Sequence, residues 1–175
     1  MQIFFLTIFL FIFIILSLFY IILFSLFLFY DIKNKVFFAP SQRKIIEEFF
    51  KIYPFEENKI FFDLGSGDGR VVFLAEKKGL KACGIENNPV LYFFSNFLKR
   101  IYKSKAVFIR KDLRKAEIEK ADYIYLYLLP KFMEEIEDDL FFKIKNGAKI
   151  ISFCFEFKKR KPKEIYLNKF YVYEK

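Results

Sequence analysis

The sequence predicts an α/β fold: a mostly parallel, doubly wound sheet that ends in an antiparallel hairpin and is preceded by one transmembrane helix. Short apolar runs alternate with amphipathic segments between residues 41 and 155, which is typical of a parallel sheet covered by helices. A glycine-rich turn follows the first of these runs. A stretch without any charged side chain occupies the first thirty residues.

The charge-free stretch is long enough to cross a membrane. At about 1.5 Å per residue, a helix over residues 1–30 spans roughly 45 Å, and a bilayer core needs only about 30 Å. A cleaved signal peptide is the competing interpretation, but the segment lacks a basic n-region and small residues at a cleavage site. We expect a transmembrane helix over 1–30, a juxtamembrane linker over 31–40 and one soluble domain over 41–175.

Charge and cysteine content bear on the compartment. Basic residues follow the helix, at Lys33, Lys35 and Arg43, and none precedes it. The positive-inside rule therefore predicts a single-pass membrane protein with its N-terminus outside and its domain in the cytoplasm or an equivalent compartment. The chain has two cysteines, Cys83 and Cys154, and no histidine. We expect reduced, buried thiols and no metal site.

The elements of the soluble domain follow in order along the chain. Ser41 is expected to cap a helix through Lys51, which Pro54 stops. Further helices are expected at 71–78, 89–102 and 131–144, strands at 59–64, 81–86, 106–109, 122–128 and 148–155, and a hairpin at 165–167 and 170–173. Such a sheet binds ligands beyond the carboxyl ends of its strands, where strands one and four meet.

The turn after the first strand, Gly65-Ser-Gly-Asp-Gly69, is suited to a ligand. Its glycines let the backbone approach a bound molecule closely. Glu86 lies 21 residues after Gly65, at the end of the second strand, where an acid commonly accepts hydrogen bonds from ribose hydroxyls. The spacing Gly-x-Gly-x-Gly differs from the dinucleotide pattern Gly-x-Gly-x-x-Gly, which disfavours NAD or FAD. The sequence therefore predicts another nucleoside-bearing cofactor.

These motifs resemble those of the class I S-adenosylmethionine (SAM) methyltransferases. Asp63 with the glycine turn resembles motif I of that family, and Gly84-Ile-Glu-Asn87 resembles the next motif. The resemblance implies a Rossmann-like fold, SAM as cofactor, an acid near the adenine amino group at Asp112, and turn N–H groups that receive the cofactor carboxylate. The cofactor-binding residues that it implies are Asp63, Gly65, Ser66, Gly67, Asp68, Gly69, Glu86, Asn87, Asp112 and Leu113. The competing interpretation is an ordinary glycine turn with surface acids.

The substrate is expected at the tip of the fourth strand. Methyltransferases that act on adenine carry Asp or Asn, two prolines and an aromatic residue at this tip, whereas this chain has Leu128-Leu-Pro130, with no side-chain acceptor for an exocyclic amine. We expect a substrate pocket of Tyr127, Leu128, Leu129 and Pro130, with Glu156 either orienting the amine or exposed to solvent. Asp122-Tyr-Ile-Tyr125 resembles a D-x-x-Y motif of some lysine methyltransferases, but it would begin the strand, and we treat it as chance.

Nearly the whole chain resembles the small membrane-anchored protein-lysine methyltransferases related to the mitochondrial ATP synthase c-subunit lysine methyltransferase. It departs from them after the fifth strand, where Cys154-Phe-Glu-Phe-Lys-Lys159 stands in place of a segment with proline and tryptophan. The resemblance implies methyl transfer from SAM to a lysine amine of a membrane-associated protein. The alternatives are an RNA methyltransferase, a small-molecule or lipid methyltransferase, and a non-catalytic SAM-binding membrane protein.

One dense basic cluster runs from Lys158 to Lys161 and includes Lys163. It could bind nucleic acid, but near anionic headgroups each basic residue gains about 1 kcal/mol. We therefore expect the cluster to lie against the membrane. The expected partners are the lipid bilayer and a membrane protein with an accessible lysine; nucleic acid is not expected, and the oligomeric state is left open.

Overall fold

A computed structural model describes residues 1–34 and 42–175, which belong to two compact units, Met1–Phe37 and Phe38–Lys175. The first unit contains one helix, α1 (Gln2–Asn34). Its segment Phe4–Tyr30 has a mean hydropathy of 3.0 and no buried part, so by length and composition it could cross a membrane, as some signal sequences also could. The helix expected over 1–30 is present and continues to Asn34. Ser41, expected to cap the next helix, lies outside the described residues.

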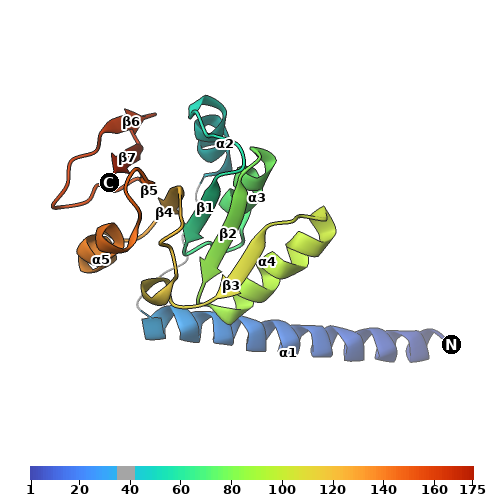
Figure 1. Cartoon of the computed structure of the whole chain (residues 1–175). Helices are drawn as coiled ribbons and strands as arrows, with labels where there is room; N and C mark the ends of the chain where they lie inside the picture. The colour runs from blue at the N-terminus through green and yellow to red at the C-terminus, as the bar shows by residue number, and fades with distance from the viewer. Residues whose placement is uncertain (35–41) are drawn as a thin grey trace. The chain divides into compact units, whose positions relative to one another are not determined.

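The second unit is built on one mixed sheet of seven strands (Figure 1). Its strands are β1 (Ile60–Leu64), β2 (Lys81–Glu86), β3 (Val107–Arg110), β4 (Tyr123–Leu126), β5 (Lys149–Phe153), β6 (Glu164–Tyr166) and β7 (Phe170–Glu174). Their spatial order is β3-β2-β1-β4-β5-β7-β6. All pairs are parallel except those of β7, which runs antiparallel to β5 and β6. The predicted parallel sheet with a terminal antiparallel hairpin is confirmed.

Helices cover both faces of this sheet. They are α2 (Arg43–Ile52), α3 (Arg70–Lys77), α4 (Pro89–Tyr102), the short 3₁₀ helix η1 (Leu113–Lys115) and α5 (Pro130–Lys143). Tyr123 and Tyr125 of β4 pack in one core with α2 and α3. Ile124 and Leu126 pack in a second core with α5. Because alternate side chains of a strand point to opposite faces, the two cores lie on opposite sides of the sheet.

Aromatic side chains fill the core beneath α2. The predicted apolar face of this helix is confirmed, with Ile46, Phe49 and Phe50 buried. The ring of Phe49 stacks on that of Phe170 in β7, with centroids 4.0 Å apart and planes 7° from parallel. Phe55, in the loop before β1, stacks on Phe50 at 4.8 Å. These ring contacts join α2 to the C-terminal hairpin across the sheet.

The fourth strand is shorter than expected. It pairs with β1 and β5 only from Tyr123 to Leu126, whereas the sequence predicted a strand to Leu128. The reason lies in β1, which ends at Leu64: the next N–H that could reach β4, that of Ser66, donates instead to the carbonyl oxygen of Ile85 in β2 (3.0 Å). With no partner on that side, residues 127–129 leave the sheet and lead into α5 at Pro130.

The acid of the D-x-x-Y sequence lies at the start of the fourth strand, as expected. Asp122 accepts the N–H of Ile60 at 2.8 Å and pairs with Lys145 at 2.6 Å. Ile60 is the first residue of β1, so this acid is at the opposite edge of the sheet from the glycine turn. Its contacts are structural, and the match to the motif is chance.

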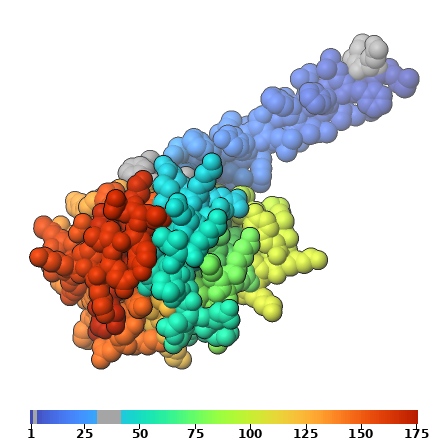
Figure 2. Space-filling view, turned by 90° about the horizontal axis from the view of Figure 1, so that it is seen from above, coloured from blue at the N-terminus to red at the C-terminus, as the bar shows by residue number. Residues whose placement is uncertain are grey.

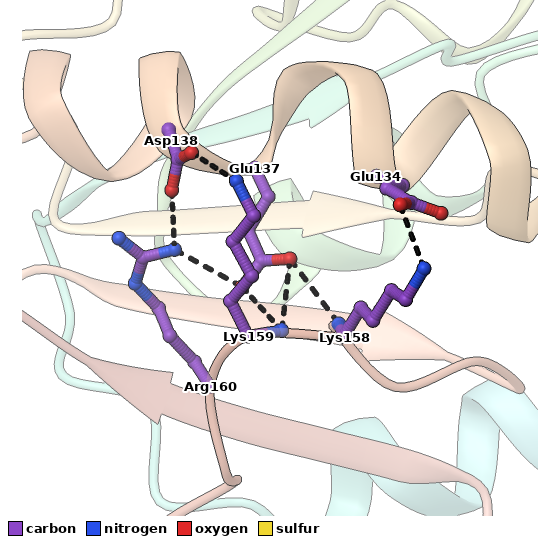
Figure 3. A network of polar contacts seen from close by, with 6 residues as sticks. All are labelled: Glu134, Glu137, Asp138, Lys158, Lys159 and Arg160. Carbon is purple, nitrogen blue, oxygen red and sulfur yellow. Dashed lines mark hydrogen bonds and ion pairs between the residues drawn. The ribbon is translucent and has the colours of Figure 1, made fainter.

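A buried carboxylate holds the loop after β5 against α5. Glu137 of α5 has no exposed side-chain surface. It accepts the backbone N–H groups of Lys158 (3.2 Å) and Lys159 (3.1 Å) and the Arg160 guanidinium (3.0 Å), as Figure 3 shows. The guanidinium also lies 4.3 Å from the ring centroid of Phe141. The single carboxylate of Glu137 thus accepts hydrogen bonds from two backbone N–H groups and pairs with one guanidinium.

The basic cluster at 158–163 is compensated by carboxylates. Lys158 pairs with Glu134 at 2.8 Å, Lys159 pairs with Asp138, and Arg160 also reaches Asp138 at 3.1 Å (Figure 3). Lys163 pairs with Glu174 at 2.6 Å. Acids of α5 and β7 thus engage four of the five cations of the cluster. The expectation that the cluster lies against the membrane stays a prediction.

Removing the Glu137 carboxylate should destabilise the domain. Glu137→Ala leaves two N–H groups of the packed loop without an acceptor, and each such orphan costs about 1–3 kcal/mol. Glu134→Ala removes only an exposed ion pair, which is worth at most about 1 kcal/mol. Thermal unfolding of the two variants in detergent would check this, and equal unfolding midpoints would contradict the role assigned to Glu137.

Candidate cofactor and substrate site

The glycine turn lies at the carboxyl end of β1 and leads directly into α3. Gly65, Gly67 and Gly69 all have positive φ, at 84°, 55° and 82°. A side chain at Gly69 would be strained, and its Cβ would lie 2.6 Å from the ring of Phe108. The backbone can make this turn over β2 and β3 only with glycine at that position.

Glu86, the last residue of β2, supports the turn. Its buried carboxylate accepts the N–H of Gly67 at 2.8 Å and the N–H of Asn88 at 2.7 Å. Asn88 in turn caps α4 by accepting the N–H of Val90 at 2.9 Å. Each carboxylate oxygen has further acceptor capacity, so Glu86 can hold the turn and still accept ribose hydroxyls.

The backbone N–H groups of the turn are largely occupied. Of the six from residue 65 to residue 70, five donate within the protein. Two of them share the carbonyl oxygen of Ile85, at 2.9 and 3.0 Å. The hydrogen bonds make the turn rigid. The expectation that these groups receive a cofactor carboxylate stays a prediction.

Asp63 is a buried acid next to other acids. It is 3% exposed, at the end of β1, and pairs in register with Gly84 on one side and Tyr125 on the other. Burial raises the pKa of its carboxyl well above the ordinary value, and the nearby carboxylates of Glu86 and Asp68 raise it further. A cation placed here would stabilise the ionised Asp63 carboxylate and so oppose both the burial and the repulsion from neighbouring carboxylates. The position is suited to an ammonium group.

Ser66 lies beneath the turn, against β2. Its hydroxyl is buried and has no hydrogen-bond partner among the described residues. A Cβ at Gly84 would lie 2.6 Å from this hydroxyl, so the Gly84 position must be glycine for the turn to settle on β2. An unsatisfied buried hydroxyl beside three carboxyl groups and a glycine turn is consistent with a site that takes a polar ligand.

The remaining predicted cofactor residues lie around this edge. Asp68 pairs with Arg70 at 2.6 Å within the turn. Asp112 follows β3 and pairs with Arg114 at 2.5 Å, which lowers the pKa of the Asp112 carboxyl. The N–H of Lys111 donates to the Glu86 carbonyl oxygen at 3.2 Å, so the loop with Asp112 starts beside Glu86.

Two further members of the predicted set flank these acids. Asn87 is half-buried between Glu86 and Asn88, and Leu113 packs partly buried on the core beneath α5. Asn88 and Phe108 were not predicted as site residues. Asn88 could have been found, because Asn directly before Pro89 at the first helical position is a helix-start signal. Nothing local to Phe108 indicates its contact with the turn.

The predicted substrate residues lie where β4 and β5 end. The half-buried ring of Tyr127 stacks on Phe155 with centroids 6.2 Å apart, and its edge meets Phe153 at 5.0 Å. Burial raises the pKa of the Tyr127 hydroxyl. Cys154, with a positive φ of 67°, follows the end of β5 between these two phenylalanines in the chain. The three aromatic side chains thus form one apolar wall.

The other predicted substrate residues differ in their surroundings. Leu128 is buried and lies 3.4 Å from the Cβ position of Gly65, so it connects the substrate side with the glycine turn. Leu129 is 47% exposed and Pro130 begins α5. Glu156 is exposed. Leu128 is thus the member that the fold brings against the cofactor side.

Both cysteines are free thiols, as expected, but only Cys83 is buried, while Cys154 is partly exposed. Burial raises the pKa of the Cys83 thiol to about 11, and the neighbouring Asp63 contributes to this. No cluster of metal-ligating side chains occurs among the described residues. Reactive-thiol chemistry at Cys83 is therefore disfavoured.

Known proteins with the same motifs and fold support a family assignment. The family model described as the ANTKMT methyltransferase domain matches residues 63–164. The ATP synthase c-subunit lysine N-methyltransferase from Rattus norvegicus is 30% identical over 122 residues, which cover 69% of this chain and 56% of the relative. A protein-lysine N-methyltransferase from Saccharolobus islandicus is 26% identical over 132 residues, which cover 73% of this chain and 82% of the relative.

A solved structure agrees with the sequence relatives. It is an RNA methyltransferase from Salinibacter ruber in complex with S-adenosyl-L-homocysteine, with a TM-score of 0.70 and 27% identity, covering 77% of this chain and 91% of that one. The chain spans about half the length of the mammalian relatives that it matches. The match over 63–164, together with the strand order and the glycine turn, identifies the chain as a member of the ANTKMT methyltransferase domain family with a Rossmann-like class I methyltransferase fold.

Proposed function

We propose that this protein transfers a methyl group from SAM to a lysine amine of a membrane-associated protein. The observation that carries the proposal is the buried Glu86 carboxylate, which holds the glycine turn at the carboxyl end of β1, beside β4, where the strand order reverses. The names of the rat and Saccharolobus relatives support a protein-lysine substrate. The bound S-adenosyl-L-homocysteine of the Salinibacter structure supports SAM as the cofactor.

In this proposal each acid at the sheet edge has its own cofactor group. The raised pKa of Asp63 suits a partnership with the ammonium group. Glu86 has acceptor capacity for the ribose hydroxyls, and Asp112 is assigned to the adenine amino group. When bound, SAM supplies a methyl group activated by a sulfonium charge. Ser66, Gly65 and Gly67 form the turn beneath the cofactor, with Asp68, Gly69, Asn87 and Leu113 around it.

The substrate side contributes position and desolvation. In-line transfer to an amine depends mainly on the alignment of the two reacting groups. A lysine must arrive neutral, and the apolar wall of Tyr127, Phe153 and Phe155 would lower its pKa by excluding water. Leu128, Leu129 and Pro130 complete the proposed pocket, and the exposed Glu156 is proposed to orient the amine. The chain needs no histidine for this reaction.

Three other activities are compatible with the fold: methylation of RNA, methylation of a lipid or small molecule, and SAM binding without turnover. RNA is disfavoured because carboxylates engage four of the five cations of the cluster at 158–163 and the tip of β4 offers no side-chain acceptor. Salt-dependent binding of RNA by the purified protein would favour that alternative.

The proposal includes an anchored arrangement. Residues 1–30 would cross the membrane, 31–40 would connect, and 41–175 would form the catalytic domain, with Met1 outside and Lys175 in the cytoplasm or its equivalent. The apolar segment Phe4–Tyr30 and the basic residues that follow it support this arrangement. Protease added to sealed right-side-out vesicles should leave the domain intact. Digestion of the domain under these conditions would show the opposite orientation.

Glu86→Ala should weaken SAM binding at least about tenfold, because each charge-assisted hydrogen bond to a ribose hydroxyl contributes roughly 1.5–3 kcal/mol. The same change should lower stability, since the N–H groups of Gly67 and Asn88 lose their acceptor. Calorimetry and thermal unfolding of the full chain in detergent would measure both effects. Glu119→Ala, an exposed acid outside the site, is the matched control. Wild-type SAM affinity in the Glu86 variant would rule out the ribose assignment.

SAM affinity should rise with pH over the window above the ordinary range of an Asp carboxyl, as long as the cofactor amino group stays protonated. The pKa of Asp63 is raised in the protein, so at the low end of this window the carboxyl is still protonated and cannot attract an ammonium group. Affinity then gains up to about tenfold per pH unit until the carboxyl is ionised. Asp63→Asn should show weaker binding and a flat profile over the same window. A pH-dependent profile in the Asn variant would show that another group titrates.

Membrane-protein lysine should be the labelled product. Tethering raises the local concentration of membrane proteins around the site without any added contact. Incubation of the full chain with radiolabelled SAM and separate membrane and soluble extracts should give acid-stable label on lysine of membrane proteins. Glu86→Ala should reduce it by at least about tenfold at limiting SAM. Label confined to soluble protein, RNA or lipid would refute the substrate assignment.

A further inference from the structure

Helix α4 has two apolar faces, and the described residues cover only one of them. Leu91 and Ser95 are buried toward the sheet, where α4 packs on β2 and β3. A second stripe, on the other side of the helix, is open to solvent. We call it the outer α4 stripe, and it consists of Phe93 (65% exposed), Phe94 (47%), Phe97 (58%) and Ile101 (56%).

The outer α4 stripe is unusual among the helices of this domain. The exposed positions of α5 are mostly charged, including Glu134, Glu135, Asp138 and Asp139. An amphipathic surface helix normally turns such a polar face to water. A contiguous row of exposed aromatic side chains instead marks a surface that another body covers. In the space-filling view, the yellow-green surface of α4 forms the flank of the domain away from the red C-terminal hairpin (Figure 2).

The charge around the outer α4 stripe is positive. Between Glu86 and Asp112 the chain has no acid and six basic residues, which are Lys99, Arg100, Lys103, Lys105, Arg110 and Lys111. Lys111 pairs with Glu117, beyond β3. Arg100 and Lys103 are exposed at the end of α4 and form no ion pair within the described part of the chain. The cluster at 158–160 differs, because carboxylates of α5 engage each of its cations.

We propose that the outer α4 stripe docks on the surface of a lipid bilayer that contains anionic headgroups. Exposed phenylalanines beside lysine and arginine form the combination that inserts into the boundary between headgroups and acyl chains. The cations would contact the headgroups while the rings enter the interface. A second copy of the chain is a poorer occupant, because it would bring together two surfaces that both carry positive charge.

This inference rests on the proposed membrane anchor. Eight residues separate α1, which ends at Asn34, from α2, which begins at Arg43. At no more than about 3.6 Å per residue, they reach roughly 30 Å, so an anchored domain stays within reach of the membrane surface. Pro89, the first residue of α4, follows Glu86 by three positions. Docking of α4 would therefore hold the proposed cofactor site close to membrane-protein lysines.

The chain contains no tryptophan, so one introduced tryptophan reports on its own position. The full chain carrying Phe97→Trp is reconstituted into phosphatidylcholine–phosphatidylserine vesicles with brominated acyl chains. We expect blue-shifted emission that the bromine quenches. The matched control is Phe142→Trp on α5, where the native ring is 83% exposed; its emission should be water-like and unquenched. Equal, unquenched emission from both reporters would overturn the proposal.

Charge reversal tests whether Arg100 and Lys103 contribute to docking on the bilayer. Arg100→Glu with Lys103→Glu should remove most of the quenching of the Phe97→Trp reporter, as should high salt, because screening weakens exposed charge interactions. Lys120→Glu with Lys161→Glu, which changes the net charge equally at exposed positions outside α4, should leave it intact. A blue shift without bromine quenching that grows with the protein-to-lipid ratio would indicate a second copy and overturn lipid docking.

The outcomes separate this inference from the proposed function. Quenching of the reporter needs neither SAM nor methyl transfer. Quenching of the reporter without lysine labelling would contradict the proposed activity and support membrane docking of the outer α4 stripe. Lysine labelling without quenching would contradict docking and support the proposed activity.

Discussion

The carboxylate of Glu86 accepts one backbone N–H from the glycine turn and one from the start of α4. These two bonds join the end of β2 to both helices that flank it, since the turn leads into α3 and Asn88 caps α4. Without this acceptor, two buried donors would be unsatisfied and the turn would lose its support over β2. The same oxygens are those that the proposed cofactor would contact, so the site and the local fold depend on a single side chain.

The acids of the site carry an electrostatic cost that a ligand can relieve. Burial and the neighbouring carboxylates of Glu86 and Asp68 raise the pKa of Asp63. A protein that needed only stability would place an apolar residue at this position. Retaining three acids at one sheet edge is understandable if a cation completes the site, as the ammonium group of SAM would.

The surface of the domain has two kinds of basic region. In the loop after β5, lysine and arginine are matched by acids of α5 and serve to hold the loop in place. Around α4, the cations have no acid within their own stretch of chain, and they lie beside exposed rings. Counting charges along the chain cannot separate these cases. The distinction depends on which helix packs beside each cluster.

The sequence alone determined the succession of strands and helices, the glycine turn and the acid at the end of β2, because hydrophobic period and glycine spacing are local properties that the chain retains in any context. It also indicated Asn88 as a helix cap, because Asn directly before a proline at the first helical position is a helix-start signal. Tertiary structure alone decided where β4 ends, because strand length depends on the partner β1 and not on the apolar run of β4 itself. It also decided that most turn N–H groups are occupied, that acids of α5 engage the basic loop, and that one face of α4 has no cover among the described residues. Each of these depends on residues far apart in the sequence, whose proximity the chain cannot reveal until it folds.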